Sequence, residues 1–245
     1  MKLHIVWLYH DLMDTYGDKG NILTLLRRLD WRGIKGELTE ISLGEKIPIG
    51  ANLLFLGGAQ DRQQRLVMQD LLDRKNEIQE YLFSGGVGLF VCAGYQLLGN
   101  YYQDADGSIV DGLEIFDLET INPGISHPRL IGNAVIKCPF LGESEYLVGF
   151  ENHGGRTILK NKMETLGKVV KGHGNNGRDK TEGVRFKNAF GTYLHGPVLP
   201  KNPKFADFLL DLAIQEFEPE HKLEPLPDVF ENKVHNELLT KLKVR

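Results

Sequence analysis

Residues 85–99 read GGVGLFVCAGYQLLG, and this stretch decides the fold. Its glycines end the preceding helical pattern. Val87 to Val91 is then a short apolar run of the kind expected for a strand that is buried on both faces of a parallel sheet. Cys92 follows at once, and a helical run begins directly after it. We therefore expect a sharp strand-to-helix turn that places the thiol at a helix N-terminus.

A thiol in such a turn can act as a nucleophile. The dipole and free N–H groups of the helix favour the thiolate, and the N–H of Ala93 could bind an oxyanion that forms beside the sulfur. Gly94 is expected because a Cβ at that position would clash in so tight a turn. The alternative is a buried and inert cysteine, since free cysteine is among the most buried residue types. The turn alone fits both interpretations.

Composition narrows the class of protein. The chain has 245 residues, of which 41% are apolar and 25% charged, as in ordinary soluble globular proteins. Its net charge of -4 argues against a nucleic-acid-binding surface. With Cys92 and Cys138 as its two cysteines, it has no disulfide framework, and we expect a cytoplasmic protein. The apolar N-terminus is interpreted as a first strand rather than a signal peptide, and no membrane anchor is expected.

The first half of the chain alternates strand-like and helix-like segments. We expect strands over 3–9, 37–43, 52–56 and 85–91. A helix is expected from Asn21 to about Gly33, and a second one over 62–83, with Leu66, Leu71, Leu72, Ile78 and Leu82 in the core. This order predicts an α/β fold with a central, mostly parallel sheet flanked by helices.

The second half changes character. Strands are expected over 113–121, 131–137, 147–150, 166–170 and 183–194, and little helix separates them, which favours additional antiparallel or mixed strands. Residues 203–217 form an amphipathic helical pattern, and 218–227 form a proline-containing linker. A final helix is expected over 230–242. We therefore assign 1–217 to one domain and 218–245 to a linker with a C-terminal helix, packed on that domain or on a partner.

A cysteine nucleophile needs a base, usually a histidine that is near in space rather than in sequence. His195 is the best of eight candidates because it ends a buried-type strand, where open α/β sheets place their chemistry. His153, in a polar glycine loop, is the next best. Gly58 follows a buried strand in a loop with little side-chain bulk. We expect the N–H groups of Gly58 and Ala93 to form an oxyanion hole.

Together, these features resemble the class I glutamine amidotransferases, in the branch that includes the cobyric acid synthases. Six blocks are more similar still to the glutaminase subunits of lipid II isoglutaminyl synthases. They are 16–21 (YGDKGN), 57–64 (GGAQDRQQ), 91–96 (VCAGYQ), 150–157 (FENHGGRT), 174–179 (GNNGRD) and 193–203 (YLHGPVLPKNP).

The resemblance implies a division of labour between two subunits. This chain would hydrolyse L-glutamine through a Cys92 thioester, with His195 as acid and base. Arg129 would bind the glutamine carboxylate, as guanidinium groups do bidentately. No cofactor is implied for this subunit. The ammonia would pass to a Mur-ligase-like, MurT-type synthetase that uses ATP and Mg and amidates the D-glutamate of the lipid II stem peptide during peptidoglycan synthesis.

Two departures from the wider class leave a question open. Phe90 stands where many of these enzymes have glycine, and Pro197 stands where they have the glutamate of the triad. A carboxylate that orients His195 would then come from elsewhere in this chain, such as Asp18, or from the partner subunit. The alternatives to the whole interpretation are a cobyric-acid-type amidotransferase with another acceptor, and an inactive amidotransferase fold that serves as a binding module.

Overall fold

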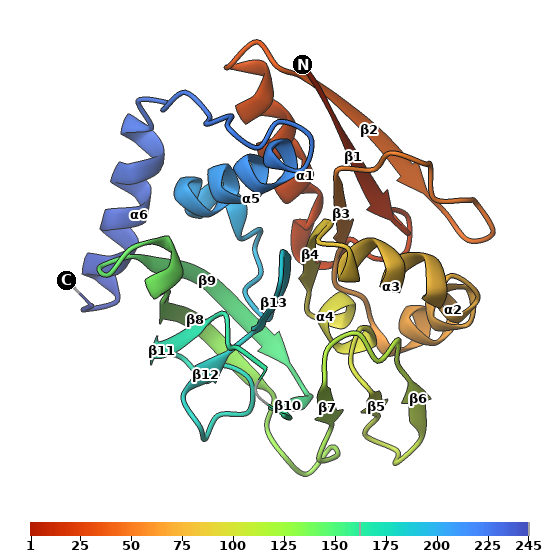
Figure 1. The fold of residues 1–245 in the computed structure, drawn as a ribbon. Helices are drawn as coiled ribbons and strands as arrows, with labels where there is room; N and C mark the ends of the chain where they lie inside the picture. Colours follow the sequence, from red (N-terminus) through yellow and green to blue (C-terminus); the bar gives the residue numbers. More distant parts are fainter. Residues whose placement is uncertain (162, 245) are drawn as a thin grey trace.

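The computed structural model describes residues 1–161 and 163–244. It is organised around a six-stranded sheet, most of whose strands are labelled in Figure 1. The strand order is β13-β14-β4-β3-β1-β2. Five strands are parallel, and β13 pairs antiparallel with β14. The bounds are β1 (Lys2–Leu8), β2 (Lys35–Ile41), β3 (Leu53–Leu56), β4 (Val87–Val91), β13 (Val184–Phe186) and β14 (Ala189–Thr192). The predicted mostly parallel α/β sheet is confirmed.

Helices cover both faces of this sheet. Helix α1 (Lys19–Asp30) connects β1 to β2, whereas α2 (Asp61–Asp73) and α3 (Lys75–Phe83) connect β3 to β4 in the opposite direction across the sheet. Because such crossovers are right-handed, the two connections lie on opposite faces. Helix α5 (Pro203–Gln215) lies beside α1, and the short α4 (Ala93–Leu97) follows β4 (Figure 1).

Two smaller sheets come from the second half of the chain. One has the order β10-β7-β5-β6, and the other has the order β12-β11-β8-β9. Every strand pair in them is antiparallel except β5 with β7, as expected for additional antiparallel or mixed strands. The bounds are β5 (Tyr101–Gln103), β6 (Ile109–Asp111), β7 (Leu118–Ile121), β8 (Leu130–Lys137), β9 (Tyr146–His153), β10 (Arg156–Leu159), β11 (Gly167–Lys171) and β12 (Thr181–Glu182).

The single helix predicted over 62–83 is wrong, because the chain leaves the helical conformation at Arg74 (φ -101°, ψ 3°). Two of its predicted core positions are also wrong: Leu66 and Leu72 are exposed. The buried stripe of α2 is instead Gln64, Val67, Met68 and Leu71. A polar residue belongs to this stripe, so a pattern read from leucines alone selects the wrong face.

Three further segment predictions need correction. Residues 113–117 precede β7 and are not strand, so the strand expected over 113–121 is four residues long. The long strand expected over 183–194 is a hairpin of β13 and β14. Strands β5, β6, β10 and β12 were not expected, because each is only two to four residues long and carries little periodic signal.

The C-terminal segment is tied to the body by buried charge. Arg28 on α1 is almost fully buried and pairs with Asp207 on α5 and with Asp228, which directly precedes α6 (Val229–Lys241). Near the end of α6, Leu239 packs against Val135 and Val148. None of the helices in the described residues has the length and apolar character needed to cross a bilayer.

Candidate active site

Cys92 occupies the predicted strand-to-helix turn. It follows β4 and precedes α4 with φ 52° and ψ -104°, a conformation that costs a non-glycine residue about 1–3 kcal/mol and is typical of strained functional positions. A Cβ on Gly94 would lie 2.5 Å from the carbonyl oxygen of Leu56, so the turn requires glycine there. Cys92 lines a cavity of about 340 Å³, and the residue as a whole is 9% exposed.

His195 follows β14, the neighbouring strand, and lies near Cys92. Because β14 pairs in parallel with β4, with Thr192 opposite Val91, the segments that follow both strands leave the sheet at one edge. A Cβ added to Gly58 would lie 2.9 Å from Cε1 of His195 and 3.4 Å from Cβ of Cys92. The structure therefore brings the predicted nucleophile, base and glycine loop together.

The protonation of His195 suits an acid near a thiolate. Its side chain is fully buried, and burial alone lowers its pKa, but Cys92 and Asp18 outweigh that effect and raise the pKa above the usual value. An imidazolium beside a cysteine thiolate can give a proton to a leaving group. Within the described residues neither ring nitrogen has a hydrogen-bond partner.

Asp18 is a buried carboxylate on the Nδ1 side of His195. Its Oδ1 lies 3.7 Å from Nδ1, which is too long for a hydrogen bond. Its Oδ2 accepts the N–H of Gly58 at 2.6 Å. The N–H that was assigned to the oxyanion hole is thus bound to Asp18 in this structure. Ala93 is the first residue of α4, so its N–H has no acceptor within that helix.

The strand end that carries His195 is held by Glu182. This fully buried carboxyl accepts the N–H of Tyr193 at 2.7 Å and the hydroxyl of Thr192 at 3.0 Å. Burial raises the pKa of Glu182 to about 8, although these two donors oppose the shift. Glu182 is therefore mostly protonated at neutral pH.

Arg129 lines the same cavity, and its orientation is fixed by a neighbour. Its Nε donates to Oδ1 of Asn152 and its Nη2 donates to the carbonyl oxygen of Asn152, both at 2.9 Å. One edge of the guanidinium is thereby used, which leaves the Nη1–Nη2 edge as a donor pair for a carboxylate. Asn152 in turn donates to the hydroxyl of Tyr16 at 2.5 Å.

Tyr16 and Asp61 are among the lining residues that sequence reasoning missed. Tyr16 has a left-handed backbone (φ 61°) and packs in a T-shaped arrangement on the ring of His195, with 5.1 Å between centroids. Asp61, in the first turn of α2, contributes a carboxylate near Arg129, and burial raises its pKa. Both lie in blocks that carried the resemblance, YGDKGN and GGAQDRQQ, but no local pattern assigned them a role.

His153, the second candidate base from the sequence, lines the same cavity as Cys92. Its ring stacks on Tyr193 with 3.6 Å between centroids and 4° between planes, and its Nδ1 donates to the carbonyl oxygen of Gly155 at 2.8 Å. Burial lowers the pKa of His153 to about 3, so the ring is neutral.

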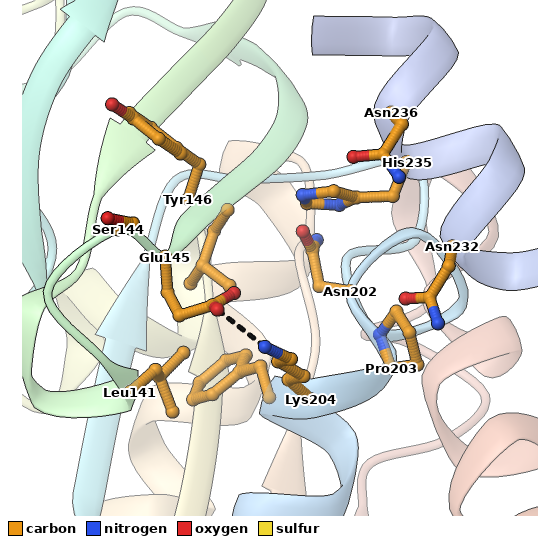
Figure 2. A pocket seen from close by; sticks show the side chains of 12 residues that line it. Leu141, Ser144, Glu145, Tyr146, Asn202, Pro203, Lys204, Asn232, His235 and Asn236 are labelled. Carbon is orange, nitrogen blue, oxygen red and sulfur yellow. Dashed lines mark hydrogen bonds and ion pairs between the residues drawn. The ribbon is translucent and has the colours of Figure 1, made fainter. Parts of the chain in front are cut away.

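A second cavity of about 370 Å³ lies between the start of β9, the start of α5 and α6 (Figure 2). It contains the ion pair of Glu145 with Lys204, and His235, whose Nδ1 bonds the carbonyl oxygen of Lys201. Although slightly larger, it has no cysteine in its lining. The described residues also contain no group of three or more His, Cys, Asp or Glu that could hold a metal ion. The cavity at Cys92 is therefore the candidate active site.

Comparisons with known proteins identify the family of the chain. Residues 4–203 match the family model of the CobB/CobQ-like glutamine amidotransferase domain. The chain is 41% identical to the lipid II isoglutaminyl synthase (glutamine-hydrolyzing) subunit GatD of Staphylococcus aureus, covering 89% of each chain. It is 39% identical to the GatD subunit of Streptococcus pneumoniae, over 88% of this chain and 82% of the relative.

Among solved structures, PurLQS from Thermotoga maritima shares the fold, with a TM-score of 0.57 and 16% identity over 99% of this chain and 100% of that one. At that identity the likeness concerns the fold alone.

Proposed function

Because the chain belongs to the CobB/CobQ-like glutamine amidotransferases, and within them to the GatD subunits, we propose that it is the glutaminase of a lipid II isoglutaminyl synthase. It hydrolyses L-glutamine to L-glutamate and ammonia in the cytoplasm. The ammonia passes to a Mur-ligase-like partner, which uses ATP and Mg to amidate the D-glutamate of the lipid II stem peptide to D-isoglutamine.

One observation carries the proposal: Cys92 and His195, from adjacent parallel strands, converge over Gly58 beside a cavity that also holds Arg129 and Asp61. A cationic and an anionic side chain in one cavity match the carboxylate and ammonium groups of a free amino acid. The nucleophile and its acid then lie where the side chain of that amino acid ends.

The first half of the reaction forms a thioester. The Cys92 thiolate attacks the side-chain carbonyl carbon of glutamine, and the carbonyl oxygen becomes an oxyanion that the N–H groups of Ala93 and Gly58 stabilise. When the carbonyl re-forms, the C–N bond breaks and the nitrogen takes a proton from the His195 imidazolium. Ammonia leaves, and the glutamyl group stays on Cys92.

The second half releases glutamate. His195, now neutral, takes a proton from water, and the hydroxide attacks the thioester carbonyl. The tetrahedral intermediate collapses, the C–S bond breaks, and Cys92 returns as a thiolate. The imidazolium and thiolate are then restored for the next turnover.

The partner is supported by the relatives, which are named as subunits of a synthase and which this chain matches over most of their length. A cobyric-acid-type acceptor would use the same glutaminase site, so it differs only in the partner. An inactive binding module is disfavoured because both Cys92 and His195 are present and placed together.

The test is ammonia release from glutamine by the full chain, with and without the proposed synthetase subunit expressed together with it. Cys92→Ser and His195→Ala should each lower kcat by at least about 1,000-fold, since the two residues act as a unit. Arg129→Ala should mainly raise KM, because it removes a carboxylate contact. Cys138→Ser is the matched control and should be fully active. If Cys92→Ser kept its activity, the mechanism would be refuted.

A further inference from the structure

The imidazole of His153 is built into the wall of the active-site cavity with one polar atom unused. Its side chain is 1% exposed, and Nε2 has no hydrogen-bond partner among the described residues. Buried polar atoms are nearly always paired, so an unpaired one in the lining of the cavity that holds Cys92 points to a ligand. The proposed mechanism leaves this residue without a role.

The position and protonation of the ring are fixed from two sides. Tyr193 stacks on its face, and the carbonyl oxygen of Gly155 accepts from Nδ1 at 2.8 Å. A carbonyl accepts but never donates, so Nδ1 carries the hydrogen. Since burial keeps the pKa of His153 at about 3, the other nitrogen has a lone pair at neutral pH. Nε2 is therefore a fixed acceptor that requires an N–H or O–H donor.

The charges around the ring select the kind of donor. Arg129, Arg156 and His195 each lower the pKa of His153, so the local field is positive. That field repels an ammonium group and tolerates a neutral amide N–H. The stacking partner Tyr193 is a neutral phenol, because burial raises its pKa well above the usual value.

We propose that His153 is a specificity-determining residue whose Nε2 accepts a hydrogen bond from the side-chain amide of bound glutamine. This inference rests on the proposed function and adds the discrimination of substrate from product. Glutamate has a carboxylate in place of the amide, which has no N–H and presents lone pairs to the lone pair of Nε2. The same contact that holds glutamine therefore opposes glutamate and favours its release after hydrolysis.

The experiment compares two substrates that give the same product. L-Glutamine and L-glutamic acid γ-methyl ester both yield glutamate, but only the amide has an N–H at the reacting group. Two variants are made in the full chain with its partner: His153→Phe keeps an aromatic ring on Tyr193, and His153→Asn keeps a donor for Gly155. What both variants lack is the acceptor at Nε2. His221→Phe, in the linker outside the cavity, is the matched control.

Both His153 variants should lower kcat/KM for glutamine about ten- to a hundredfold and change that for the ester less than about threefold. Equal losses on both substrates would show a structural role and overturn the inference. Unchanged kinetics on glutamine would overturn it as well.

Binding to the Cys92→Ser variant separates this inference from the proposed function. Calorimetry should show glutamine bound more tightly than glutamate, and adding His153→Phe should bring the two affinities within about threefold of each other. This arm decides the role of His153 even if wild-type protein fails to hydrolyse glutamine, an outcome that would refute the proposed function. A preference for glutamine that survives in the double variant, or no binding of glutamine at all, would overturn the role of His153.

Discussion

The buried carboxyl of Glu182 makes the stability of the protein depend on pH, and Glu182→Gln should remove that dependence. The folded protein holds the proton of Glu182 with a pKa of about 8, against 4.5 for the unperturbed group, because the side chain is fully buried. The folded state therefore binds more protons than the unfolded chain between these two values. The contribution of Glu182 to the free energy of unfolding is highest below pH 4.5 and falls as the pH rises to 8.

The size of the effect follows from the two pKa values. At 1.36 kcal/mol per pH unit, the interval between 4.5 and about 8 corresponds to about 5 kcal/mol in full, and about 4 kcal/mol of it is lost between pH 5 and pH 9. A glutamine side chain does not titrate, and its carbonyl oxygen can still accept the N–H of Tyr193.

The assay is urea unfolding of wild-type protein and Glu182→Gln at pH 5, 7 and 9. Other groups titrate in both proteins, so the informative quantity is the difference in the free energy of unfolding between them. That difference should move by about 4 kcal/mol against the wild type from pH 5 to pH 9. If the two proteins kept parallel pH profiles, or if the wild type gained relative stability as the pH rose, the assignment of a buried neutral carboxyl would be refuted.

Three other perturbations test separate parts of the structure. Iodoacetamide should label Cys92 at least about 100-fold faster than Cys138, because Cys138 is fully buried and burial raises its pKa. Mass spectrometry measures the two labelling rates, and comparable rates would contradict this expectation. Gly58→Ala should lower kcat about 100-fold, since its Cβ would displace His195; normal kcat would contradict the geometry. Arg28→Met should cost about 3 kcal/mol in urea unfolding, because it leaves Asp228 unpaired and leaves Asp207 with Arg32 alone; an unchanged midpoint would contradict this.

The parts of the site that could be predicted are those that a short, continuous stretch of sequence determines. A buried apolar run that ends at Cys92 and continues as a helix has one plausible geometry, and the structure has it. His195 was predicted for the same reason, as the end of a buried strand. When two parallel strands are neighbours in the sheet, the residues that follow their carboxyl ends lie close together. β4 and β14 are such neighbours, so Cys92 and His195 meet.

The parts that could not be predicted depend on tertiary contacts. Asp61 and Tyr16 come from two distant segments, and only the folded chain shows that one cavity contains both. The break at Arg74 and the burial of Gln64 follow from packing rather than from propensity. The contact of Asp18 with Gly58 joins residues 40 positions apart and has no sequence signal.

The hydrogen bond from the N–H of Gly58 to Asp18 competes with the binding of an oxyanion at the same N–H. One amide proton cannot serve two acceptors at full strength, and a carboxylate 2.6 Å from the Gly58 nitrogen would also repel a second negative oxygen there. Before Gly58 can help an oxyanion, Asp18 must release this N–H. Asp18 directly follows Tyr16 and Gly17, and Tyr16 is half exposed at the mouth of the cavity. The position of this surface loop therefore sets which acceptor the N–H of Gly58 binds, Asp18 or an oxygen atom beside Cys92.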